Sequence, residues 1–223
     1  MTNIILLKID KLGQLGRIFF ILPQCGTPCA FLCQKNDMKE FDLWLFDTLQ
    51  FEVLENSLRK AALFYGENIT DALLQNNVTL FLNDKRNRRV LGSYSPFSIT
   101  LFDTRSSMHT MLDCVFVHEL AHFLDNIRTI EESRFKYASS IHGSKERVLA
   151  ELFRSKMSPV PENRRRYRGR TCECFARAIE EYYALKTNNN FWLDEHRDFD
   201  YYVKFEVFEN TISPVVEDYL KKL

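Results

Sequence analysis

The segment His118-Glu119-Leu120-Ala121-His122 brings together residue types that can hydrolyse a bond with the help of a metal ion. On a helix, residues i and i+4 lie on one face, so the two imidazoles can bind one zinc ion through their ring nitrogens. Glu119 is rotated by about 100° from His118, and its carboxylate can take a proton from a zinc-activated water molecule. The pattern predicts His118 and His122 as zinc ligands and Glu119 as the catalytic base. The alternative is a pair of ordinary, partly buried histidines on a core helix.

A catalytic zinc ion needs a third protein ligand and an open fourth position. The extended motif with a later glycine and a third histidine is excluded, because Asp125 and Arg128 stand in those places. The best candidate is Glu173, near the start of a second helix that we expect over residues 172–186. Its alternative role is that of a first-turn glutamate, stabilised by the helix dipole and paired with Arg177 at i+4. The residues by themselves leave both roles open.

Asp125 lies on the same face of the predicted helix as His118 and His122. An acidic side chain there can orient a ligand histidine by accepting a hydrogen bond from its ring. A surface carboxylate, or a partner of Arg177, is an equally open interpretation.

The elements that must position these residues indicate an α+β fold, with one domain expected over residues 76–223. Short β-rich runs precede the histidine helix, which is expected to run to about Ile127 from a cap at Ser106 or Ser107. Residues 129–170 are rich in charge, which indicates a mobile insertion that contains a short helix. The expected strands are 78–82, 89–94 and 98–102, the turn between the last two is Ser95–Pro96, and the short helix is about 145–153.

Residues 1–75 are expected to form a mostly helical segment packed on that domain. Apolar residues recur every four positions over residues 38–64, which is typical of an amphipathic helix, and Gly66 can end it. Residues 3–22 fit either a strand pair or an amphipathic helix. Residues 23–33 contain two prolines and a glycine, which predicts a loop.

The composition excludes several classes of protein. The chain has 223 residues, of which 45% are hydrophobic, so we expect a packed core and not a disordered chain. Its 30 basic and 30 acidic residues balance, so no global field attracts nucleic acid or anionic membranes. Charged residues interrupt the apolar start, and no apolar run is long enough to span a bilayer. We therefore expect a cytoplasmic protein without a Sec signal or a membrane partner, while export by a signal-independent route stays open.

Two local patterns carry weaker expectations. Basic runs at residues 85–89 and 164–170 are usually solvated loops, and the sharper alternative is contact with a polyanion such as nucleic acid. Cys25, Cys29 and Cys33 recur every four residues, but a proline interrupts any helix there and no fourth ligand is evident. A metal role for these thiols is not favoured, and we expect them to be reduced.

The segments HELAHFLD (118–125) and ECFARAIEEYY (173–183) resemble the glutamate-type zincins. The likeness is strongest to the metallopeptidase domain associated with large polyvalent proteins of phages and mobile elements, and more distant to the catalytic domain of anthrax lethal factor. In these proteins a Glu-x-Phe-Ala segment on a later helix supplies the third zinc ligand, which implies this role for Glu173. The segment LGSYSPFSITLFD (91–103) resembles the substrate-side edge strand of the family. The resemblance covers about residues 78–185.

The resemblance implies a zincin-like fold, in which a small twisted β-sheet packs on the His-Glu-x-x-His helix and a second helix carries Glu173. It implies a zinc metalloendopeptidase that acts on protein or peptide substrates. Lethal factor has a tyrosine shortly before its ligand glutamate that stabilises the oxyanion, and Tyr167 is the nearest match, with one residue less spacing. Two other functions remain open: a nucleic-acid-associated zinc protease anchored by the basic runs, and a non-catalytic zincin-fold interaction module. The intact Glu119 argues against the second of these.

Overall fold

The computed structural model describes part of the chain, and two compact units are distinguished in it. They comprise Met1–Phe116 and Val117–Leu223, and each is considered by itself. The boundary that the sequence predicts near residue 75 stays a prediction. The described residues are 16–18, 21–24, 27–30, 56–57, 60–66, 69, 72–73, 76, 78–83, 91–96, 98–102, 109–130, 137–158, 167, 169–189 and 203–223.

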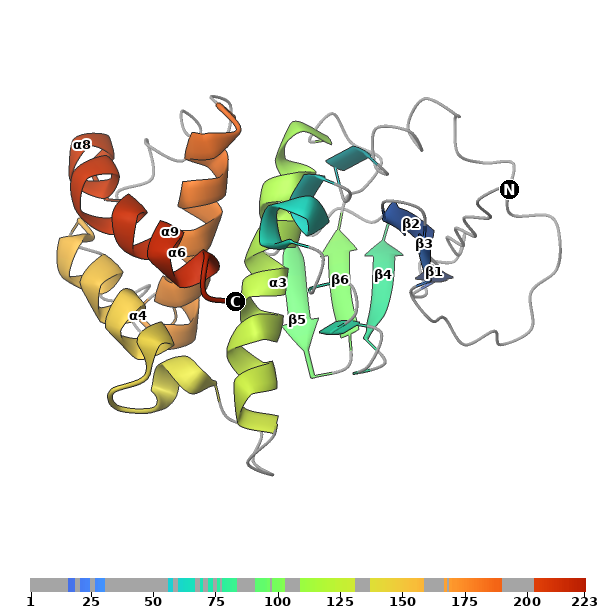
Figure 1. Cartoon of the computed structure of the whole chain (residues 1–223), viewed down its shortest axis with the longest axis horizontal. Helices are drawn as coiled ribbons and strands as arrows, with labels where there is room; N and C mark the ends of the chain where they lie inside the picture. Colours follow the sequence, from blue (N-terminus) through green and yellow to red (C-terminus); the bar gives the residue numbers. More distant parts are fainter. Residues whose placement is uncertain are drawn as a thin grey trace, which may run out of the picture. The chain divides into compact units, whose positions relative to one another are not determined.

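A four-stranded mixed sheet is the main element of the first unit (Figure 1). Its strands lie in the order β1-β4-β6-β5, with β4 parallel to β6 and both outer pairs antiparallel. The central strand β6 carries Ile99 and Leu101, which are 1% and 0% exposed. The three strands predicted before the histidine helix are confirmed: β6 has the predicted bounds, and the ends of β4 and β5 are shifted by one to three residues. Their bounds are Gly16–Ile18 for β1, Thr79–Asn83 for β4, Gly92–Ser95 for β5 and Ser98–Phe102 for β6.

The strand β5 forms one edge of this sheet. It pairs antiparallel with β6, from Gly92 opposite Leu101 to Ser95 opposite Ser98, so the predicted hairpin is confirmed. Within the described strands β5 has no second neighbour, which leaves one row of its backbone groups open to a further strand. Pairing of a substrate with this edge stays a prediction.

The loop predicted over residues 23–33 is wrong for its first part. Strands β2 (Ile21–Gln24) and β3 (Thr27–Ala30) form an antiparallel hairpin in which Pro23 lies opposite Pro28. Alternate pairs of an antiparallel ladder exchange no N–H···O bonds. Two facing prolines fit such a pair, because proline has no N–H to donate. For residues 3–22 the sequence allowed either a strand pair or an amphipathic helix. Residues 16–18 and 21–22 of this segment lie in strands β1 and β2.

Helical residues 56–57 and 60–65 precede strand β4, and the helix ends as predicted at Gly66. Gly66 has a positive φ of 86°, and its N–H donates to the carbonyl of Leu63 at 3.1 Å. This left-handed conformation closes the helix at little cost only for a residue without a Cβ. Most of the amphipathic helix predicted over residues 38–64 lies outside the described residues.

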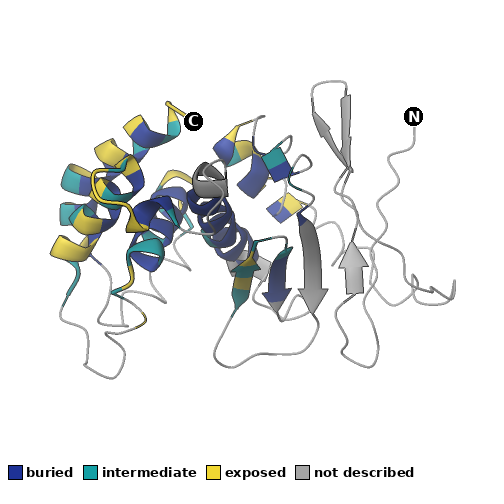
Figure 2. Cartoon of the chain, turned by 90° about the horizontal axis from the view of Figure 1, so that it is seen from below, coloured by how far each residue is buried: buried dark blue, intermediate teal, exposed yellow. Residues whose placement is uncertain are grey.

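Helices make up the described part of the second unit. The long helix α3 (His109–Ile130) enters it, and α6 (Thr171–Lys186) lies beside α4 and α9 (Figure 1). Helices α4 and α9 are buried on one face and exposed on the other, whereas α6 and the described side chains of α3 are buried or half-buried almost all round, as the burial colours of Figure 2 show. Edge-to-face aromatic pairs join them, with ring centroids 5.4 Å apart for Phe175 and Tyr219. The other helical segments are a turn at Ala138–Ser140, α4 (Lys145–Lys156), α8 (Phe205–Val207), a π-helical turn at Phe208–Ile212 and α9 (Ser213–Leu220).

The short helix predicted inside residues 129–170 is confirmed as α4, but the mobile insertion around it is wrong for residues 137–158. The first turn of α4 is capped by Ser144, whose hydroxyl accepts a hydrogen bond from the Arg147 N–H at 3.0 Å. Its inner face is buried, with Leu149 and Phe153 at 1% and 0% exposure. The charged residues of α4 lie on the outer face of an amphipathic helix, except Glu146, which is buried and accepts a hydrogen bond from the Tyr219 hydroxyl at 3.1 Å.

These elements establish an α+β protein. The packing of the sheet on α3 that a zincin requires stays a prediction. No helix in the described part of the chain has the length and apolar content needed to cross a membrane.

Candidate metal centre

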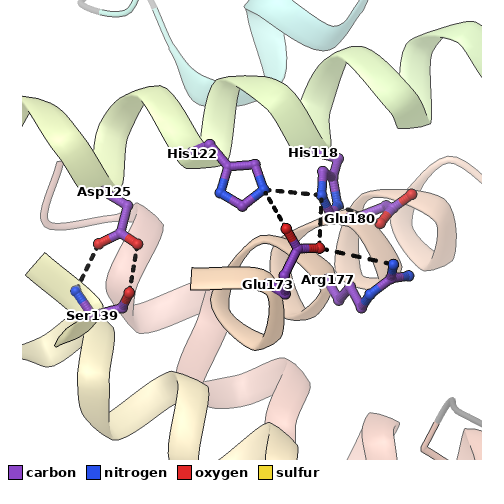
Figure 3. A network of polar contacts seen from close by, with 7 residues as sticks. All are labelled: His118, His122, Asp125, Ser139, Glu173, Arg177 and Glu180. Atoms are coloured by element: carbon purple, nitrogen blue, oxygen red, sulfur yellow. Dashed lines mark hydrogen bonds and ion pairs between the residues drawn. The ribbon is translucent and has the colours of Figure 1, made fainter. Parts of the chain in front are cut away.

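His118, His122 and Glu173 converge in the second unit, as the sequence predicts (Figure 3). The Nε2 atoms of the two histidines lie 3.1 Å apart. Glu173 Oε1 lies 3.5 Å from His122 Nε2, and Glu173 Oε2 lies 3.8 Å from His118 Nε2. Three ligands at tetrahedral angles around one zinc ion are separated by roughly 3.4 Å, since each lies about 2.1 Å from the metal. The distances from the two imidazoles to their nearer Glu173 oxygens are close to this value, and one ligand atom from each residue lies within 4.8 Å of the other two, so the group could hold a single ion.

The two helices bring these atoms together through simple spacing. The histidines occupy consecutive turns on one face of α3, and Glu173 lies in the first turn of α6. An acidic residue is favoured in a first turn by the helix dipole, and Arg177 Nη2 lies 4.0 Å from Glu173 Oε2 one turn later. The dipole and Arg177 therefore act on the same carboxylate that faces the histidines. The contact with Arg177 expected for a first-turn glutamate is therefore present, and the role of Glu173 as a zinc ligand stays a prediction.

The donor set is chemically suited to a divalent transition metal such as zinc. Two imidazole nitrogens and one carboxylate are typical ligands of catalytic zinc, and they leave a fourth position open. Glu173 Oε2 is buried, and it accepts no hydrogen bond within the described part of the chain. A buried carboxylate oxygen without a donor is costly unless a cation compensates it. The residues present therefore fit a metal ion, which the geometry by itself does not identify.

Glu180 is a functional residue that the sequence reasoning missed. Its Oε2 accepts a hydrogen bond from His118 Nδ1 at 2.8 Å, and the residue is 3% exposed (Figure 3). With its proton on Nδ1, a neutral imidazole presents the Nε2 lone pair toward the other two ligands. Glu180 follows Glu173 by seven residues, which is two turns of one helix face. That spacing was the signal that could have identified it.

The charges of this cluster shift the pKa values of its members. Burial by itself lowers the pKa of His118, but the nearby carboxylates, with Glu180 foremost, raise it to about 9. Burial acts against ionisation of Glu173, while the two histidines and Arg177 hold its pKa at about 2. Without a metal, the cluster therefore holds a protonated His118 against an ionised Glu173 at neutral pH. A metal ion must displace the proton of His118 in order to bind.

Glu119 is buried beside this cluster and is 5% exposed. Burial raises the pKa of its carboxyl, the two histidines lower it, and the charges of Glu173 and Glu180 raise it again. A carboxyl group in the position of a general base takes up a proton and later returns it. Its role as a base stays a prediction.

Asp125 does not orient a ligand histidine, and each of the three interpretations from the sequence is wrong for it. It is fully buried, and its two oxygens accept hydrogen bonds from the backbone N–H and the hydroxyl of Ser139, at 2.7 and 2.6 Å (Figure 3). Burial raises the pKa of Asp125 to about 6, although both hydrogen bonds from Ser139 lower it. The spacing placed Asp125 on the correct helix face, but its partner comes from a later turn of the chain that spacing cannot reveal.

Tyr167 lies next to the cluster and is 53% exposed. Burial and the Glu173 carboxylate, which also hydrogen-bonds to it, raise the pKa of its hydroxyl, so this hydroxyl stays protonated. The guanidinium carbon of Arg170 lies 5.4 Å from the centroid of its ring. Tyr167 can thus donate a hydrogen bond close to the third ligand, and its role at an oxyanion stays a prediction.

Several predicted features lie outside the described residues. They include most of the basic run at 164–170, the run at 85–89, and Cys25 and Cys33. Cys172 and Cys174, on either side of Glu173, are free thiols, and burial raises their pKa values to about 12 and 11.

Compared with known proteins, the chain matches no family model, and no curated protein or solved structure gives a significant match. The resemblance to the glutamate-type zincins therefore rests on its motifs. The geometry of the site is the further indication of function.

Proposed function

We propose that this protein is a zinc-dependent metallopeptidase of the glutamate-type zincin class. The observation that carries the proposal is the convergence of His118 Nε2, His122 Nε2 and a Glu173 carboxylate oxygen within 4.8 Å of one another. His-Glu-x-x-His motifs with a distant glutamate ligand serve hydrolysis in the proteins that this chain resembles. A zinc ion bound to these residues would supply Lewis-acid chemistry, which acidifies water and polarises a carbonyl group.

The residues of the chain have distinct roles in this proposal. Glu119 takes a proton on its carboxylate during attack and later donates it to the leaving amine. The carboxylate of Glu180 holds the proton of His118 on Nδ1, which keeps Nε2 available as a ligand. The hydroxyl of Tyr167 donates a hydrogen bond to the negative charge that develops on the substrate oxygen.

Metal analysis of purified variants tests the ligand set. Wild-type protein and Glu119→Gln are expected to retain one zinc ion per chain after dialysis, because Glu119 is not a ligand. His118→Ala and Glu173→Ala are expected to lose it. Glu151→Ala is the matched control, since Glu151 pairs with Arg147 on the outer face of α4, away from the cluster. Zinc retained at full stoichiometry by Glu173→Ala would contradict the proposal.

Peptide hydrolysis tests the catalytic role. Zinc-loaded wild-type protein is expected to cleave members of a mixed peptide library, and Glu119→Gln to lower the rate by about 10²–10⁴-fold. Products are identified by mass spectrometry. A Glu119→Gln protein that binds zinc and cleaves at the wild-type rate would exclude Glu119 as the base. A wild-type protein that binds zinc and cleaves nothing would favour the non-catalytic interaction module.

A further inference from the structure

Tyr137 is an aromatic residue at the metal site that the motifs do not include. It immediately precedes the turn Ala138–Ser140, and its ring centroid lies 5.8 Å from that of His122 at an angle of 56°. Tyr137 is partly exposed, whereas His122 is 6% exposed. A partly accessible aromatic ring therefore lies beside a buried ligand histidine.

The backbone around Tyr137 is fixed by side chains from two helices. Asp125 on α3 accepts both hydrogen bonds of Ser139, at 2.7 and 2.6 Å, and both residues are 0% exposed. Ser144, the cap of α4, donates from its hydroxyl to the carbonyl of Ala138 at 2.7 Å. Ser140 donates from its hydroxyl to the carbonyl of Tyr137 itself at 2.6 Å. Three consecutive residues after Tyr137 thus hold its backbone in one place.

This arrangement is more than a turn requires. A short turn at a protein surface closes through its own backbone bonds, and here the Ser140 and Ile141 N–H groups supply them, to Tyr137 and Ala138. A buried carboxylate such as Asp125 is costly, and it is retained only where its hydrogen bonds matter. What the bonds of Asp125 add is a fixed position of the turn relative to α3, which is the helix that carries the histidines.

We propose that Tyr137 is a substrate-contacting residue that determines specificity. Its ring forms one wall of the metal site and takes an aromatic or large apolar side chain next to the bond that is hydrolysed. Asp125 and Ser139 are positioning residues that hold Tyr137 in place. The inference rests on the proposed function, and it goes beyond it by naming a side-chain preference and the residues that create it.

Two hydroxamates that bind zinc through the same group test the inference without a turnover assay. Acetohydroxamate has no side chain, and 3-phenylpropanohydroxamate carries a phenyl ring. Isothermal titration of zinc-loaded wild-type protein is expected to show a preference for the phenyl compound of about fivefold or more, the size of an aromatic contact. Tyr137→Ala is expected to abolish the preference for the phenyl compound and to leave the affinity for acetohydroxamate unchanged. Tyr137→Phe is expected to retain the preference.

Serine variants separate the positioning role from general stability. Ser139→Ala removes one of the two hydrogen bonds to Asp125. It is expected to reduce the preference for the phenyl hydroxamate while the protein keeps its full zinc content. Ser155→Ala is the matched control, because its hydroxyl bonds only within α4, to the carbonyl of Leu152 at 2.7 Å, and the preference should not change. If Tyr137→Ala fails to fold, Tyr137→Leu takes its place, since leucine keeps the bulk and lacks the aromatic face.

The outcomes distinguish this inference from the proposed function. An equal preference in wild-type protein and in the Tyr137→Ala or Tyr137→Leu variant, with zinc bound, overturns the role of Tyr137 and leaves the metal site intact. An equal loss of affinity for both hydroxamates in these variants also overturns it, because the ring of Tyr137 would then affect metal binding and not contact the phenyl group of the ligand. Failure of wild-type protein to bind zinc or acetohydroxamate overturns the proposed function itself.

Discussion

Two buried carboxylates lie at or next to the part of α3 that carries the histidines, and they differ in the groups that compensate their charge. At the first, Glu173 faces two imidazoles and Arg177, and its pKa is about 2. At the second, Asp125 faces the neutral donors of Ser139, and its pKa is about 6. Cationic neighbours keep an acid ionised and ready to bind a metal, whereas neutral donors only hold it in place. We call these regions the metal-binding cluster (His118, His122 and Glu173) and the Asp125 clamp (Asp125 and Ser139).

The largest difference between the two regions is expected from removal of their carboxylates. Glu173→Ala should abolish zinc binding at micromolar metal, because two histidines alone leave the ion without an anionic ligand. Asp125→Asn should keep zinc at full stoichiometry. Metal analysis after dialysis provides the measurement. Equal loss of zinc in the two variants would mean that the clamp and the cluster act as one unit.

Glu180→Gln is expected to have the next largest effect. The glutamine side chain is similar in size but carries no charge, so His118 loses the acceptor that fixes its tautomer and strengthens it as a ligand. Comparable changes beside a metal lower its affinity by about 10–100-fold. Competition with a fluorescent chelator measures the affinity, with Glu209→Gln, an exposed position on the π-helical turn, as control. An unchanged affinity would show that Glu180 is a structural partner only.

The pH dependence of zinc affinity tests the electrostatics of the cluster. The pKa of His118 without metal is about 9, so the ion displaces one proton at lower pH. Affinity should rise about tenfold per pH unit below this value and level off above it. The stability of the metal-free protein depends on pH in the opposite direction. Protonated His118 stabilises the folded protein fully below pH 6.5, and this stabilisation is lost as the pH rises through about 9. Titrations in which zinc affinity falls with rising pH would contradict this description.

The smallest effect is expected from Asp125→Asn, and it concerns stability. The amide can accept only one of the two hydrogen bonds from Ser139 and turns a donor toward the other. Loss of a buried hydrogen bond costs about 1–3 kcal/mol, which should appear as a lower midpoint of thermal unfolding. Asp218→Asn, at an exposed site on α9, should leave the midpoint within experimental error. A midpoint for Asp125→Asn equal to that of the wild type would show that the clamp adds no stability.

The sequence was informative where spacing on one element decides the geometry. The i, i+4 pair His118 and His122 could be predicted, because helix periodicity alone puts their rings on one face. Glu173 required a guess about which second helix faces the first, and Glu180 was missed although the same periodicity places it two turns after Glu173. The helices α4 and α6 could also be predicted from the sequence.

Contacts between residues that no helical or strand periodicity links could not be predicted from the sequence. The partner of Asp125 is Ser139, which reaches it from a turn beyond the end of α3, and no periodic pattern links the two residues. Tyr137 was overlooked for the same reason. The hairpin of β2 and β3 was missed because its two prolines usually indicate a loop, and only the pairing register shows that they face each other.

In the function that we propose, three side chains from two helices hold one metal ion. Crystals of the zinc-loaded protein, measured on both sides of the zinc absorption edge, test it most directly. We expect one strong anomalous peak about 2.0–2.2 Å from His118 Nε2, His122 Nε2 and a Glu173 carboxylate oxygen. A peak bound to the histidines without Glu173, or located at other residues, would contradict the account.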